Sequence, residues 1–182
     1  MCYKKFCILL LSLIFCGAAV ADGNMDKPTA KASELAKRYV LANETDKPSV
    51  LQEFDNLAQD NPDNVNVIRN YTSLLSSRGQ YEKAIAWLVP INKVRNNPSL
   101  LLQECMLKHR VSHSDTACYK RVIGLSEHQG REDMDYLMAL YFTDDRTFQT
   151  VKQRLLQQNP AFSSDFTLFE QDKLDMLRSL YP

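Results

Sequence analysis

Two cysteines and two histidines lie close together in the middle of the sequence and could bind a metal ion. Cys105, His109 and His113 are four residues apart, so on a helix they would share one face, and Cys118 follows five residues later. Two sulfurs and two imidazoles are ligands that suit zinc. Three ligands spread along one helix, however, span about 12 Å, which is too far for a single ion. This distance favours a disulfide between Cys105 and Cys118 over a zinc site. The zinc site is the alternative, and free thiols are the third possibility.

The first 21 residues bear on this choice because they predict export. Two lysines precede an apolar run over residues 6–15, and Ala19-Val20-Ala21 gives a small-x-small cleavage pattern. The run is short for a membrane-spanning helix, which favours a cleaved signal peptide over residues 1–21 rather than an uncleaved anchor. Cleavage removes three of the five cysteines and leaves Cys105 and Cys118. An even number of cysteines in an exported chain favours a disulfide between them.

Cys16 suggests an alternative N-terminus, in which a lipid is attached to this cysteine. The bulky Phe15 stands where lipoprotein signals carry a small residue, so simple cleavage is favoured. We therefore expect an exported protein that is periplasmic, with secretion or lipid anchoring as the alternatives. It would contact a membrane only through an uncleaved or lipidated N-terminus.

Patterns that would indicate catalysis or nucleic-acid binding are missing. The chain has no Gly-x-Ser-x-Gly turn, no phosphate-binding glycine loop and no His-Glu-x-x-His. Asp144 and Asp145 form a carboxylate pair, but before Arg146 and Thr147 an Asp commonly caps the next helix. The formal net charge is 0, and it becomes 0 − 2 = −2 when residues 1–21 leave with their two lysines. We expect no enzyme activity, no cofactor, no small-molecule substrate and no nucleic-acid partner.

The residues that follow predict helices and no sheet. Residues 22–30 are polar and form a flexible lead-in, and residues 31–182 form one domain with helical periodicity. Caps and breakers place the expected helices at residues 30–43, 48–60, 64–77, 81–94, 99–111, 114–128, 132–142, 147–158 and 165–180. Pro90 falls inside the fourth of these and should bend its last turns or split them off.

The segment Val65–Pro98 resembles one tetratricopeptide repeat. Gly79 and Tyr81 match the turn glycine and the following aromatic residue of that family, and Ala84 and Leu88 match the small and large apolar positions of the second helix. Residues 31–62 resemble the repeat more loosely, and residues from 99 onward more weakly still. The resemblance implies an all-α solenoid of antiparallel helix hairpins, with about nine helices and a C-terminal capping helix. Spacing suits five apolar residues to that cap: Phe166, Phe169, Leu174, Leu177 and Leu180.

The same resemblance places the two remaining cysteines and a binding groove. Cys105 and Cys118 fall at positions that face each other in a helix hairpin, which sharpens the disulfide prediction. Tetratricopeptide proteins hold peptides or partner domains in a groove lined by the first helix of each hairpin. The positions carried over to that groove are Tyr39, Asn43, Asn66, Arg69, Ser73, Ser77, Gln103 and Arg110.

Within that groove Arg69 and Arg110 could take a carboxylate, and Tyr39 offers a stacking face. A merely solvated helix face is the competing interpretation of these residues. The resulting hypothesis is an exported protein-interaction module, an adaptor or scaffold that serves as an accessory factor of envelope secretion, pilus or surface assembly. The alternative hypothesis is a small exported metal-binding or redox protein that uses Cys105 and Cys118 with His109.

Overall fold

The computed structural model describes residues 25–111 and 115–182. The expected signal peptide, the first residues of the lead-in and His113 lie outside these ranges. Helices and no strands are found in the described part of the chain, so the all-α prediction is confirmed. None of the described helices is both long and apolar enough to span a bilayer.

The first four helices form two hairpins: α2 (Lys27–Leu41) with α3 (Lys47–Asp60), and α4 (Val65–Ser77) with α5 (Tyr81–Val94). Local signals set their ends. Asp26 caps α2 by accepting a hydrogen bond from the Thr29 N–H at 2.8 Å, so residues 27–30 are helical and not part of a flexible lead-in. Gly79, with φ of 68°, ends α4 in the left-handed conformation that glycine adopts without strain. Pro90 does not split α5, which continues to Val94.

The second half of the chain begins with α6 (Pro98–Arg110) and α7 (Thr116–His128), followed by α8 (Met134–Phe142) and α9 (Phe148–Gln158). Two 3-10 turns, η1 (Pro160–Ser163) and η2 (Asp165–Glu170), lead to the last helix, α10 (Lys173–Leu180). The single helix expected over residues 165–180 was wrong. Asp172 caps α10 by accepting from the Leu174 N–H at 2.8 Å, and this cap starts a new helix.

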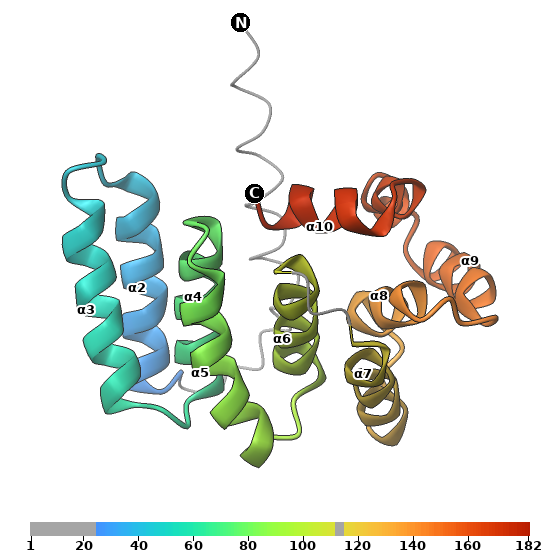
Figure 1. Ribbon diagram of the computed structural model, residues 1–182, viewed down its shortest axis with the longest axis horizontal. Helices are drawn as coiled ribbons and strands as arrows, with labels where there is room; N and C mark the ends of the chain where they lie inside the picture. Colours follow the sequence, from blue (N-terminus) through green and yellow to red (C-terminus); the bar gives the residue numbers. More distant parts are fainter. Residues whose placement is uncertain (1–24, 112–114) are drawn as a thin grey trace, which may run out of the picture.

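Successive helices pack against one another along the chain, and α6 lies at the centre (Figure 1). Two clusters of buried apolar side chains meet on this helix. Leu100 and Leu107 of α6 belong to the cluster formed with α2–α5, whereas Leu101, Leu102 and Cys105 belong to the cluster formed with α7–α10. Almost every side chain of α6 between residues 98 and 107 is buried as a result.

The last helix returns to the middle of the molecule instead of only covering its far end. Figure 1 shows α10 crossing back from α9 towards α6, and α10 packs against α6. Phe166, Phe169 and Leu177 are buried as expected for a cap. Leu174 is 45% exposed, and Met176 takes a fully buried place that spacing had not assigned to it.

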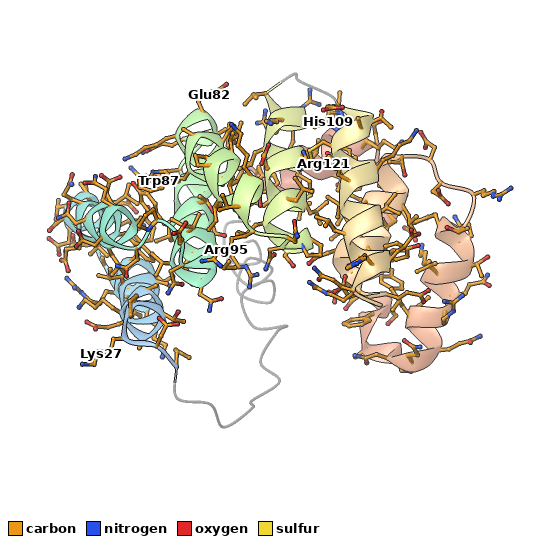
Figure 2. All side chains as sticks on the ribbon, turned by 90° about the horizontal axis from the view of Figure 1, so that it is seen from below. Lys27, Glu82, Trp87, Arg95, His109 and Arg121 are labelled. Atoms are coloured by element: carbon orange, nitrogen blue, oxygen red, sulfur yellow. A yellow bond between two sulfur atoms is a disulfide. The ribbon has the colours of Figure 1, made fainter. Side chains whose placement is uncertain are left out.

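Viewed from below, the ribbon forms an arch (Figure 2). Glu82, on α5, lies at its outer, upper edge, and Lys27, at the start of α2, lies at its lower left end. Contacts also skip along the chain, from α2 to α4, from α4 to α6 and from α6 to α8. We call the surface of these four alternate helices the inner face.

Candidate functional site

Polar side chains link the alternate helices of the inner face to one another. Between α2 and α4, the Asn66 amide donates to the Thr29 hydroxyl at 3.5 Å. Between α4 and α6, the Gln103 amide donates to the Ser73 hydroxyl at 3.4 Å, and the Thr72 hydroxyl lies 3.1 Å from the Gln103 amide oxygen. This row of polar contacts includes three of the residues carried over from the resemblance: Asn66, Ser73 and Gln103.

The row continues from α6 to α8 through charged groups. The Ser99 hydroxyl donates to the Asp135 carboxylate, and an Arg131 nitrogen lies 3.7 Å from the same carboxylate. Arg131 also donates to Asp133 through Nε at 2.9 Å. Because Ser99 and Gln103 are one turn apart on α6, the neutral and charged parts of the row adjoin.

Arg69 stands beside this row on α4 with a guanidinium that has no ion-pair partner among the described residues. Arg69 is exposed on one side, but desolvation by the surrounding helices lowers its pKa most; the negative charge of Asp135 opposes this effect, and the positive charge of Arg131 adds to it. Charged groups shift one another's pKa only when they are close together in the fold. Arg69 of α4, Asp135 of α8 and Arg131, which precedes α8, are therefore neighbours. The inner face therefore holds two guanidiniums close to one half-buried carboxylate.

Asp135 combines partial exposure with a perturbed pKa. About a third of its side chain, 34%, is accessible to solvent. Desolvation by the surrounding helices nevertheless raises its pKa, and the negative charge of Asp133 adds to this, against the lowering effects of Ser99, Arg131 and Arg69. A carboxylate that water reaches from one side, with helices around the other sides, explains both observations.

Four of the residues carried over from the resemblance do not join the row. Tyr39 is only 7% exposed, and its buried hydroxyl has no hydrogen-bond partner within the described residues, so it offers no open stacking face. Asn43 lies after the end of α2, where its side chain accepts from the Thr45 hydroxyl and the Asp46 N–H. Ser77 is exposed at the end of α4 and donates to the Leu74 carbonyl.

Arg110 is the fourth, and it contacts the C-terminal segment instead. Its Nε donates to the Tyr181 carbonyl oxygen at 2.9 Å, and its guanidinium lies 5.1 Å from the centre of the Tyr81 ring. The structure thus separates Arg69 from Arg110. Arg69 lies beside the polar row, whereas Arg110 is occupied by another part of the same chain.

Cys105 and Cys118 form a disulfide that joins α6 to α7, with their Cα atoms 5.7 Å apart. This distance lies within the usual range for a disulfide. Both residues are buried, at 2% and 4% exposure, which makes the bond a structural link and not an open redox site. The sulfurs are bonded to each other, and no group of three or more potential ligands is placed to hold a metal ion within the described residues.

His109 takes part in aromatic packing next to this disulfide. Its ring meets the Tyr119 and Phe142 rings edge-on, and its Nδ1 lies 3.2 Å from the Tyr119 hydroxyl. Burial and the nearby charge of Lys173 lower the His109 pKa. A neutral imidazole at neutral pH suits a place among aromatic rings.

Ser99, Arg131 and Asp135 are inner-face residues that the sequence analysis did not identify. Asp135 lies in the first turn of α8, where acidic residues are common in any helix, and Arg131 lies in the loop before that helix. The residue that marks the start of α8 in the sequence is Asp133, because it caps this helix. The match to the repeat beyond residue 99 is weak, and it carried only Gln103 and Arg110 over to the groove.

Comparison of the chain with protein-family models, curated proteins and solved structures finds no match. The resemblance to tetratricopeptide repeats consequently stays a prediction.

Proposed function

We propose that this chain is an exported protein-interaction module that binds a segment of another protein on its inner face. The observation that supports this most directly is the polar row. It runs across four alternate helices, and Arg69 lies beside it without an ion-pair partner in the described structure. Asn66 and Ser73 are the exposed members of this row, whereas Thr29, Thr72 and Gln103 are buried and link the helices beneath them. Exposed polar groups on a rigid helical surface suit a peptide backbone and its polar side chains, whereas catalysis would need a nucleophile or a base in a pocket.

The charges of the row favour a partner segment with an acidic group near Arg69. An arginine can bind a carboxylate through two parallel hydrogen bonds, which fixes orientation as well as affinity. Arg131 already contacts Asp133 and Asp135, so Arg69 is the cation that a partner would meet. In this proposal the protein acts as an adaptor or scaffold. Its role as an accessory factor of envelope secretion, pilus or surface assembly is an analogy with exported helical-repeat proteins.

Site-specific photo-cross-linking in the source cells tests the proposal. The photoreactive amino acid benzoylphenylalanine replaces the exposed Ser73 on the inner face in one variant and Glu82 on the outer edge in a matched control (Figure 2). We expect a discrete cross-linked protein from position 73 and none from position 82. Adding Arg69→Ala to the position-73 variant should reduce the yield about tenfold, the loss expected for one charge-assisted contact. Equal cross-linking from both positions, or from neither, would remove the inner face as the binding site.

Export is tested on the same cells. Fractionation should place the protein outside the cytosol, and the mass of the purified chain should correspond to a start at Asp22. A mass that retains residues 1–21, or that contains an added lipid, would replace cleavage with one of the two anchored alternatives.

A further inference from the structure

The segment that follows α10 is bound by Tyr81 at the start of α5 and by Arg110 at the end of α6. The Tyr181 carbonyl oxygen accepts hydrogen bonds from the Tyr81 hydroxyl and from Arg110 Nε, each at 2.9 Å. The Tyr81 hydroxyl also contacts the Pro182 carbonyl oxygen. Around this oxygen the Arg110 guanidinium covers the Tyr81 ring at 5.1 Å. The side chain of Tyr181 packs against both core clusters, so one residue spans the two halves of the molecule.

These contacts place the segment at the last residue of α6, an inner-face helix, and at the first residue of α5 beside it. Ser99, Gln103, Met106 and Arg110 recur every three or four residues and share one side of α6. Ser99 is partly exposed at one end of this stripe, whereas Met106 is only 8% exposed nearer the other end, where Arg110 meets Tyr181. Burial raises the Tyr181 pKa, and the negative charge of Asp135 raises it further, so the ring lies within electrostatic reach of the charged end of the polar row.

The contacts to Tyr181 are of a kind that another chain could reproduce. Both hydrogen bonds go to one main-chain oxygen, which every peptide offers, and the ring fills space between apolar clusters. Bonds of this type recognise an extended backbone and one aromatic side chain, not a particular sequence.

We propose that residues 181–182 act as an internal ligand that occupies one part of the inner face, and that a partner with an aromatic residue in an extended segment displaces them. This inference rests on the proposed function for the identity of the surface. It adds the class of partner and a form of regulation, because the protein binds with full strength only after its own segment has left. A tethered segment competes at an effective concentration in the millimolar range, which is enough to hold a weak site closed.

A peptide added in trans tests the proposal without knowledge of the partner. The probe spans residues 176–182, carries a fluorophore, and has benzoylphenylalanine in place of Tyr181. It is irradiated with the mature full chain and with the full-chain variant Tyr181→Ala, in which the internal ligand lacks its ring. We expect labelling of Tyr181→Ala to exceed that of the wild-type chain at least about tenfold, since the tethered competitor is weakened. Mass spectrometry should map the label to α4, α5 and α6.

Two further variants keep the test decisive. Arg110→Ala in the Tyr181→Ala background should abolish the gain in labelling, because the donor to the peptide carbonyl is lost. If Tyr181→Ala fails to fold, Tyr81→Phe replaces it; this change removes one hydroxyl, leaves the ring beneath Arg110, and should give a smaller gain.

Equal labelling of the wild-type chain and the folded variants would overturn the internal ligand, and so would label located on α3 or α9. The two proposals can fail separately. A cross-linked partner at position 73 that is unaffected by Tyr181→Ala and Tyr81→Phe would retain the binding function and eliminate the internal ligand. Peptide labelling as expected with no partner at position 73 would do the reverse.

Discussion

The two sides of α6 are stabilised in different ways. In α2–α5, polar side chains connect neighbouring helices: the Asp55 carboxylate of α3 accepts from Tyr71 of α4 and pairs with Lys83 of α5 at 2.9 Å. Between α2 and α3, Arg38 donates two hydrogen bonds to Glu53, at 2.7 and 2.8 Å. In α7–α10, a disulfide to α6 and a large group of aromatic rings are added to such links, one of which is the hydrogen bond from Tyr136 of α8 to Glu127 of α7 at 3.0 Å.

This aromatic group extends from α6 to η2 through contacting rings: His109, Tyr119, Phe142, Tyr141, Phe148, Phe169 and Phe166. Two of the helices it joins are short, with nine residues in α8 and 11 in α9. Helices of this length have little stability by themselves. The comparison teaches that the regular hairpins are held by apolar packing and by polar links between neighbouring helices, whereas the irregular half also depends on a covalent bond and on large aromatic side chains.

Removal of the disulfide should produce the largest effect and should act mainly on the second half. The bond joins residues separated by 13 positions, and in the chain-entropy model a loop of that size contributes about 3 kcal/mol. Cys105→Ala with Cys118→Ala is therefore expected to lower the free energy of unfolding by about 3 kcal/mol in urea titrations. Amide hydrogen exchange should accelerate more in α7–α10 than in α2–α4. Reductant should destabilise the wild-type chain and leave the double variant unchanged; equal acceleration in both halves would contradict the comparison.

Loss of one hydroxyl should be costly in the first half and mild in the second. Tyr71→Phe removes the bond to Asp55 and should cost about 1–2 kcal/mol in thermal or urea unfolding at neutral pH. Tyr119→Phe is the matched control, since its hydroxyl only meets His109 Nδ1 at 3.2 Å, and it should cost about 0.5 kcal/mol. The reverse order of these two effects would show that the polar network does not hold α3–α5 together.

The Tyr71→Phe effect should also depend on pH. Burial opposes ionisation of Asp55, but bonds from Tyr71, Lys83 and Gln59 outweigh it and hold the Asp55 pKa below 3.8. The stability supplied by this carboxylate is therefore present above pH 3.8 and is lost as the pH falls through the lower pKa of the folded state. The difference between wild type and Tyr71→Phe should shrink in that acidic range.

A gain in stability is expected at the turn between α8 and α9. Asp144 has φ of 52°, a left-handed conformation that costs free energy for a residue with a side chain. Its ion pair with Lys173 involves a carboxylate that is 84% exposed, so the pair contributes little. Asp144→Gly should raise the free energy of unfolding by roughly 0.5 kcal/mol in a urea titration. Asp144→Ala, which keeps the strain and loses the ion pair, should show no gain.

The smallest effect concerns Asp135 at the boundary of the two halves. Asp135→Asn should change stability by no more than about 0.5 kcal/mol, because the amide can still accept from Ser99. Burial raises the Asp135 pKa above 3.8, so between that value and the folded pKa the folded chain binds more protons than the unfolded chain. Stability of the wild type should then fall as the pH rises through this window. Melting curves from pH 4 to 7 should show Asp135→Asn gaining on the wild type as the pH rises; a constant difference would contradict the raised pKa.

Most of the fold could be predicted from the sequence because helix ends are local events. α5 begins and ends where expected, and caps such as Asn64 and Asp115 place neighbouring helices within a few residues. The exception was Asp172, which stands inside an apolar pattern of helical spacing and was taken for an interior residue. The structure shows that Asp172 is a cap because the chain before it forms the separate 3-10 turn η2 and not the same helix.

The candidate site was predictable only in the half that matches the repeat. Asn66, Arg69 and Ser73 are placed by a clear register on α4, and the inner face includes them. Tyr39 and Arg110 were assigned from weaker registers; the first is buried, and the second contacts a residue 71 positions away. The apolar periodicity of one helix cannot predict a hydrogen bond between such distant residues. This bond forms only because α10 returns to α6.

The position of α6 in both clusters has a consequence for how the chain acquires its structure during synthesis. The first four helices emerge before α6, yet their cluster lacks Leu100 and Leu107 until α6 arrives. The later helices in turn have no surface to dock on without its other side. Completion of either half therefore waits for the same thirteen residues. Once that helix is in place, each cluster has its remaining buried side chains and Cys118 can find its partner.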